Sequence, residues 1–155
     1  FMDMGAHAVH LMRAFLGPVE KVCATIGNAA GIYPDVDDNG TALFRFKSGA
    51  LGVVEASWVQ TGGASGLEVT GSEGTIYNDQ ELGYVIGVPG KDPVAVVKAD
   101  EKPTRIERLL RAIRGEVPAG ELAEDLKCAA DAVAIVEACY ASSEQGAWVD
   151  VSRLG

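Results

Sequence analysis

The residues best suited to chemistry lie close together near the start of the chain. Asp3, His7 and His10 are spaced four and three residues apart, and the sequence contains no other histidine. On a helix, residues at this spacing lie on roughly one face. Histidine is suited to proton transfer near neutral pH, and a carboxylate one turn earlier can orient its imidazole. The cluster is therefore a candidate for general acid–base chemistry.

Two other interpretations of the same spacing remain open. The three side chains can simply be the polar start of a capped helix, with no part in chemistry. They can also bind zinc or iron, because aspartate and histidine are ligands of both metals. The metal interpretation lacks a clear further ligand, since no CxxC pair is present and Cys23, Cys128 and Cys139 lie far apart.

Length and composition limit the classes of protein to consider. The 155 residues suit a single domain, and no run of about 18 apolar residues predicts a transmembrane helix. Acidic residues outnumber basic ones by 22 to 13, which gives a net charge of −9. Without a basic surface, binding to nucleic acid or to an anionic membrane is not expected. The three separate cysteines predict free, buried thiols and a cytoplasmic protein.

The predicted elements place the cluster on a helix. Asp3 is expected to cap a helix from Met4 to Leu16, with an apolar stripe at Leu11, Ala14 and Phe15. A capping box at Thr104 starts a second helix. Strands are predicted at 19–27, 41–47, 50–59, 67–70, 75–77, 83–88 and 94–99, followed by helices at 104–114 and 121–145. The apolar face of the last helix is predicted at Leu122, Leu126, Ala129, Val133, Val136 and Tyr140.

This order of elements predicts an α+β fold. Successive hairpins imply an open, largely antiparallel sheet, and the helices at the two ends of the chain are expected to pack on one face of it. No GxGxxG segment follows a strand, so the sequence has no Rossmann unit of its own. The opposite face of such a sheet must be covered by something else.

Four segments, in this order, resemble the C-terminal domain of the Gfo/Idh/MocA oxidoreductases. The first, Met2–Gly17, contains the Asp-x-Gly-x-His pattern that opens a helix in that family. The others are residues 38–58, 68–75 and 137–149. The family joins an N-terminal Rossmann domain to a C-terminal antiparallel sheet domain. The resemblance implies that residues 1–155 are a single substrate-binding and dimerisation domain, and that the nucleotide-binding domain is missing.

The resemblance also implies roles for particular residues. In inositol-dehydrogenase-like members the histidine of this pattern accepts a proton from a substrate hydroxyl, which assigns catalysis to His7 and support of His7 to Asp3. The substrate would be a sugar, polyol or cyclitol with a secondary hydroxyl, and hydride would pass to NAD or NADP bound mainly by the missing domain. His10, where many members carry aspartate, is a candidate substrate contact, as are Trp58 and Gln60. Packing within the sheet is an equal interpretation of Trp58.

Other expectations follow from the same resemblance. The open sheet face is expected to form a homo-oligomer, and the isolated chain is expected to be inactive. The family's catalytic lysine lies in a Glu-Lys-Pro segment of the missing domain, so Glu101-Lys102-Pro103 is interpreted as coincidence. Two alternatives to the dehydrogenase remain: a non-catalytic binding or oligomerisation domain, and a metal-dependent enzyme that uses Asp3, His7 and His10.

Overall fold

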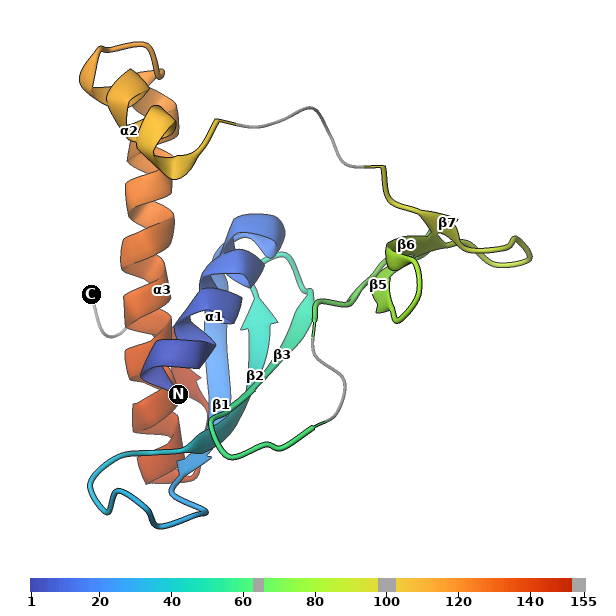
Figure 1. The fold of residues 1–155 in the computed structure, drawn as a ribbon. Coiled ribbons are helices and arrows are strands. Elements are labelled where there is room, and N and C mark those ends of the chain that lie inside the picture. The colour runs from blue at the N-terminus through green and yellow to red at the C-terminus, as the bar shows by residue number, and fades with distance from the viewer. Residues whose placement is uncertain (63–65, 98–102, 152–155) are drawn as a thin grey trace. The chain divides into compact units, whose positions relative to one another are not determined.

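The computed structural model describes residues 1–62, 66–97 and 103–151 (Figure 1). The chain divides into two compact units. The first comprises Phe1–Gln60 with Arg111–Gly155, and the second comprises Thr61–Leu110. Glu101 and Lys102 of the Glu-Lys-Pro segment lie outside the described residues. The Asp-x-Gly-x-His segment belongs to the first unit.

A four-stranded antiparallel sheet, here called sheet A, forms the centre of the first unit. Its strands are β1 (Val19–Gly27), β2 (Asn39–Phe46), β3 (Leu51–Ser57) and β8 (Val149–Asp150). They lie in the order β3-β2-β1-β8. The β2–β3 hairpin turns at Gly49, whose φ of 89° is a backbone conformation that glycine adopts without strain.

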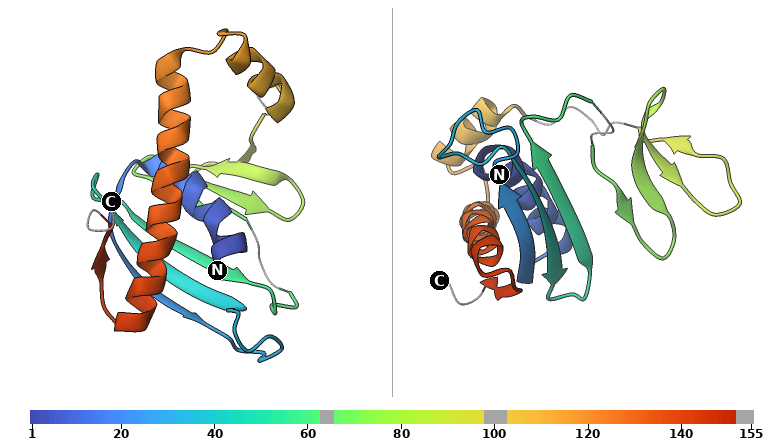
Figure 2. Two further views of the ribbon diagram at one scale, coloured as in Figure 1. Left: turned by 90° about the vertical axis from the view of Figure 1, so that its left-hand side faces the viewer. Right: turned by 90° about the horizontal axis from the view of Figure 1, so that it is seen from below.

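Helices α1 (Met2–Leu16) and α3 (Ala119–Gln145) pack on one face of sheet A (Figure 2). Side chains alternate along β2, so Ala42, Phe44 and Phe46 are buried beneath the helices. Gly52 of β3 lies under Met12 of α1, where a Cβ atom would come within 2.9 Å of its sulfur. The strand and the helix therefore meet closely.

Small residues let α3 lie close to β1. Cys128, Ala132, Ala138, Cys139 and Ser142 are buried along its inner side. The three cysteines are free thiols, as expected, although Cys23 is only half-buried. Burial raises the pKa of the Cys139 thiol to about 12, so this group stays protonated in the core.

The second unit contains another antiparallel sheet, in the order β4-β5-β6-β7. Among the described residues of this unit only Val85 is buried. Its strands are β4 (Val69–Thr70), β5 (Thr75–Asp79), β6 (Gly83–Gly87) and β7 (Val94–Ala95).

Helix α2 (Arg105–Ile113) begins with the expected capping box. The Thr104 backbone N–H donates to Glu107 Oε2 at 2.7 Å, and the Glu107 N–H donates to Thr104 Oγ1 at 3.3 Å. Every residue of α2 is at least partly exposed. No helix within the described ranges combines the length and apolar character needed to cross a membrane.

The predicted fold class is confirmed, with differences in the details. The antiparallel strands divide into two four-stranded sheets instead of one. Helix α1 begins at Met2, so Asp3 lies inside the helix and does not cap it. The expected stripe of Leu11, Ala14 and Phe15 is exposed, because α1 turns Val9, Met12 and Arg13 toward the core instead.

The apolar face predicted for the last helix is wrong for half of its members. Val136 is buried and Tyr140 is half-buried, but Leu126, Ala129 and Val133 are exposed. Small side chains form the inner face because the helix approaches β1 closely, and spacing that favours large apolar residues misses this.

Candidate active site

The two sides of α1 differ in burial. Gly5, Val9, Met12 and Arg13 face the core, and 3.6 residues per turn then place Asp3, His7 and His10 on the opposite, exposed side. The site residues predicted from the spacing therefore do share one face of one helix. Among the described residues, the side chains of Asp3 and His7 make no hydrogen bond to each other.

Arg13 fixes the inner side of α1 to α3. Its side chain is only 4% exposed, and its Nε donates to Asp131 Oδ2 at 2.7 Å. Its Nη2 also donates to Glu124 Oε1 at 3.2 Å. Burial alone would raise the pKa of Asp131, but the hydrogen bond and charge of Arg13, with the charge of Lys127, outweigh burial and lower it. The Asp131 carboxylate is thus held ionised against the helix that carries the site.

The ring of Phe1 fixes the start of α1 against sheet A. It is 4% exposed and lies against Gly5 and Gly40. A Cβ atom on Gly5 would lie 3.1 Å from the ring, and one on Gly40 would lie 2.8 Å from it. The glycine of the Asp-x-Gly-x-His pattern therefore leaves room for an aromatic ring beneath the helix.

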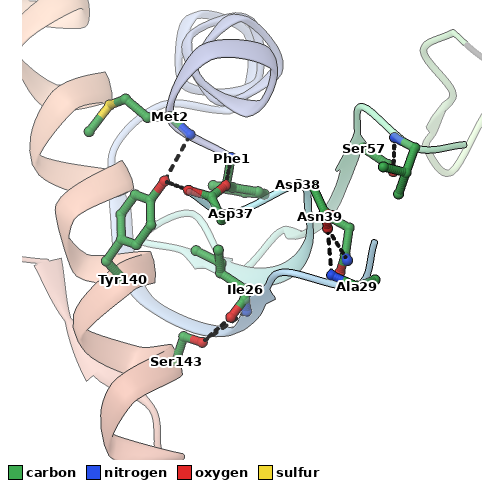
Figure 3. A network of polar contacts seen from close by, with 11 residues as sticks. Phe1, Met2, Ile26, Ala29, Asp37, Asp38, Asn39, Ser57, Tyr140 and Ser143 are labelled. Carbon is green, nitrogen blue, oxygen red and sulfur yellow. Dashed lines mark hydrogen bonds and ion pairs between the residues drawn. The ribbon is translucent and has the colours of Figure 1, made fainter. Parts of the chain in front are cut away.

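Polar contacts fix the first turn of α1 to two other segments (Figure 3). The Met2 N–H donates to the Tyr140 hydroxyl of α3 at 3.0 Å. That hydroxyl donates to Asp37 Oδ1, in the β1–β2 loop, at 2.8 Å. The Phe1 nitrogen donates to Asp37 Oδ2. Spacing in the sequence did not reveal these contacts, since Asp37 and Tyr140 are 103 residues apart.

Asp38 organises the loop that carries Asp37. Its carboxylate accepts the backbone N–H groups of Ala29 and Ala30, each at 2.7 Å, and the side-chain amide of Asn39 at 2.9 Å. The hydrogen bond from Ala29 makes the largest contribution to lowering the pKa of this carboxyl, and those from Ala30 and Asn39 add to it. The sequence marked this segment only as a turn.

The same turn fixes the backbone of Trp58. The Trp58 N–H donates to the Asp38 carbonyl at 2.8 Å, directly after β3. The Trp58 side chain is 62% exposed, so it does not pack within the sheet. Gln60, two residues on, is also exposed. Trp58 and the start of α1 are thus connected through residues 37 and 38. Within the described residues, no hydrogen bond joins the Trp58 or Gln60 side chain to His7.

Neither a metal nor a dinucleotide fits the described residues well. Residues 1–62, 66–97 and 103–151 contain no group of three His, Cys, Asp or Glu side chains placed to hold a metal ion, so Asp3, His7 and His10 do not form one. A dinucleotide phosphate site needs a glycine-rich loop between a parallel strand and a helix. Both sheets are antiparallel, and none of the described helices begins in that way.

Residues 1–77 match the sequence model of the GFO/IDH/MocA C-terminal domain. The match includes α1 with its Asp-x-Gly-x-His pattern and the three long strands of sheet A. No curated protein sequence matches the chain.

Solved structures share the fold over nearly the whole chain. An oxidoreductase from Agrobacterium radiobacter, in complex with NAD+, L-tartaric acid and magnesium, is 22% identical with a TM-score of 0.67, over 99% of this chain and 49% of that one. The WlbA dehydrogenase from Bordetella pertussis, in complex with NADH and UDP-GlcNAcA, is 23% identical with a TM-score of 0.64, over 94% and 43%. A levoglucosan dehydrogenase, in complex with NADH and L-sorbose, is 20% identical with a TM-score of 0.66, over 96% and 49%.

The chain spans about half the length of the solved structures that it matches. The fold, the order of its elements and the matched segment agree with the resemblance seen in the sequence. The chain belongs to the Gfo/Idh/MocA family, in which it is an oxidoreductase C-terminal domain.

Proposed function

We propose that this chain is the catalytic and substrate-binding part of an NAD(P)-dependent oxidoreductase that acts on a secondary hydroxyl of a sugar, polyol or cyclitol. The observation that carries the proposal is the exposed Asp3–His7 pair, one turn apart on a helix whose other side is fixed in the core. The dinucleotide would bind mainly to a further, N-terminal domain, and the 155 residues alone are expected to be inactive.

His7 is the proton acceptor in this proposal. The substrate O–H bond breaks, its proton passes to an imidazole nitrogen of His7, and the carbon–oxygen double bond forms as hydride leaves the same carbon. Asp3, one turn earlier, orients the imidazole and stabilises its protonated form. When bound, the nicotinamide supplies the acceptor for that hydride.

The substrate class is supported by the ligands of the similar structures. L-Tartaric acid, UDP-GlcNAcA and L-sorbose all carry secondary hydroxyls. His10 lies on the same side of α1 as His7, which supports the proposal that it binds a neighbouring hydroxyl. Trp58 and Gln60 are proposed as further substrate contacts, because both are exposed and follow β3. The end of β3 lies near the start of α1, since Ala56 pairs with Gly40, which lies against the Phe1 ring.

Self-association through sheet A is part of the same proposal. The face away from α1 and α3 exposes apolar side chains, among them Leu51 at 72% and Val53 at 62%. Arg45 lies over the Trp148 ring on this face, with its guanidinium carbon 6.0 Å from the ring centroid. An exposed apolar sheet face in an otherwise acidic chain favours burial against a second copy.

Replacing His7 in the complete enzyme tests the proposal. We expect His7→Ala to lower kcat by about 100-fold or more, with an unchanged melting temperature, because the side chain accepts a proton but does not pack in the core. His10→Ala on the same exposed side is the matched comparison, and we expect it mainly to raise KM. Unchanged turnover in His7→Ala would remove His7 from the assigned role.

A further inference from the structure

Within the described residues, the first turn of α1 receives no capping hydrogen bond from a side chain of its own. Its N-cap residue is Phe1, whose side chain makes no capping hydrogen bond, and Asp3 lies inside the helix. The first backbone N–H groups of a helix have no partner within it and need acceptors from elsewhere. For Met2 that acceptor is the Tyr140 hydroxyl of α3, at 3.0 Å.

Asp37 determines how the Tyr140 hydroxyl is oriented. The hydroxyl hydrogen points to Asp37 Oδ1, at 2.8 Å, which leaves the oxygen lone pairs free to accept from Met2. The other carboxylate oxygen accepts from the Phe1 nitrogen. Asp37 therefore contacts both Phe1, which precedes the helix, and Tyr140, whose hydroxyl accepts from the first N–H group of the helix (Figure 3).

The Asp37 side chain is itself held by an ordered loop. The adjacent Asp38 carboxylate accepts from Ala29 and Ala30, and the Asp38 N–H donates to the Gly27 carbonyl at 3.0 Å. The loop thus begins and ends on neighbouring strands of sheet A. The loop is therefore ordered by hydrogen bonds of its own, in addition to those that Asp37 makes to Phe1 and Tyr140.

We propose that Tyr140 and Asp37 are positioning residues, which cap α1 from outside and thereby hold Asp3 and His7 in place for proton transfer. The inference rests on the proposed function, because it assigns these contacts to the orientation of the proton acceptor. Asp3 lies in the turn whose N–H group Tyr140 binds, and His7 lies one turn further on. Loss of this contact therefore disturbs the turn that carries Asp3 first, and His7, one turn further on, through the helix backbone.

Tyr140→Phe in the complete enzyme is the primary test, since it removes one hydroxyl and keeps the ring. We expect kcat to fall by about 10-fold with KM changed less than about 2-fold, because misplacing a catalytic group slows the chemical step more than it weakens binding. Asp37→Asn keeps an acceptor for the tyrosine hydroxyl, so we expect it to retain more activity than Asp37→Ala.

Ser143→Ala is the matched control. Ser143 lies on α3 three residues beyond Tyr140, and its hydroxyl bonds the backbone of Ile26 in β1, at 2.8 Å from the N–H and 3.2 Å from the carbonyl. Ser143→Ala therefore also removes a hydroxyl that joins α3 to another segment, but the hydrogen bonds of this hydroxyl go to β1 and not to α1. We expect Ser143→Ala to lower the melting temperature with kcat unchanged.

A double-mutant cycle separates positioning from general destabilisation. If Tyr140 acts through Asp3, then Tyr140→Phe has little further effect on kcat in an Asp3→Asn background. Amide hydrogen exchange of residues 2–8 should also be faster in Tyr140→Phe than in Ser143→Ala.

The outcomes distinguish this inference from the proposed function. Loss of turnover in His7→Ala, with equal kcat in Tyr140→Phe and Ser143→Ala, would overturn the positioning role and leave the function intact. Fully additive effects of Tyr140→Phe and Asp3→Asn would also overturn it. Wild-type turnover in His7→Ala would overturn the function first.

Discussion

The two sides of α1 differ: residues on the inner side pack in the core, and residues on the outer side are exposed. On the inner side, Val9 and Met12 pack against sheet A, and the buried Arg13 joins α1 to α3. On the outer side, Asp3 and His7 are exposed. Sheet A shows the same division, with one face beneath helices and the other exposed. Substitutions on the inner sides should therefore change stability, and substitutions on the outer sides should change activity or association.

Two neighbouring residues of β2 lie on opposite faces of sheet A and differ in exposure. Phe44 is 1% exposed beneath the helices, and Leu43 is 45% exposed on the other face. We expect Phe44→Ala to lower the free energy of unfolding by about 3–5 kcal/mol, because it removes a buried ring and leaves a cavity. Leu43→Ala should cost less than about 1 kcal/mol in the monomer. Chemical denaturation of both variants measures the difference.

Leu43 also tests whether the exposed face of sheet A takes part in self-association. Leu43→Asp places a charge on the exposed face, and we expect it to weaken self-association of the complete enzyme. Sedimentation at several concentrations would show this. Equal destabilisation by Phe44→Ala and Leu43→Ala would mean that the two faces do not differ as described.

Arg13 tests whether a charged residue on the inner side acts through stability. We expect Arg13→Met to lower the free energy of unfolding by about 2 kcal/mol, because the hydrogen bonds to Asp131 and Glu124 are lost while the apolar stem is kept. Thermal unfolding measures the loss, and kcat per folded molecule should stay near that of the wild type. A stable variant with low kcat would place Arg13 with the active-site residues.

Two glycines of sheet A test the space that the Phe1 ring requires. Gly40→Ala would put Cβ 2.8 Å from the ring and 3.1 Å from Ile26, and we expect it to cost about 1–2 kcal/mol. Gly27→Ala, on the neighbouring strand, meets nothing within 4 Å and serves as the control. Equal melting temperatures for the two variants would show that the ring does not fill this space.

The smallest expected effect is the pH dependence of the Arg13–Asp131 pair. The pKa of Asp131 is lower in the folded protein than its ordinary value of 3.8. Its contribution to stability is therefore present above that value and is lost as the pH falls through the lowered one. As the pH falls from about 6 through this range, the wild type should lose more stability than Asp131→Asn. Parallel stability curves for the two proteins would contradict this.

The sequence predicted what depends on local pattern. The spacing of Asp3, His7 and His10 correctly placed the three on roughly one helix face, because helical periodicity alone fixes that relation. That this face is exposed was not predicted. The antiparallel hairpins and the capping box of Thr104 and Glu107 are equally local, and the structure confirms both. The catalytic roles of His7 and Asp3 stay predictions.

What the sequence could not predict depends on distant contacts. The cap of α1 was assigned to Asp3, but it comes from Tyr140, which is 138 residues from the Met2 N–H that it accepts. The apolar face of α3 was misplaced because close packing on β1 selects small residues such as Ala138 and Cys139. Neither the Tyr140 contact nor the buried face of α3 follows from neighbouring residues, because each depends on a segment that is distant in the sequence.

The central claim is that His7 accepts the proton of the substrate hydroxyl, and its most direct test is the pH dependence of kcat/KM. The complete enzyme and its His7→Gln variant would be compared over about pH 5–9 with a polyol substrate and saturating NAD or NADP. We expect wild-type kcat/KM to fall on the acid side of this range, and the residual activity of His7→Gln to lack that fall. The same acid-side fall, at the same pH in both proteins, would contradict the account.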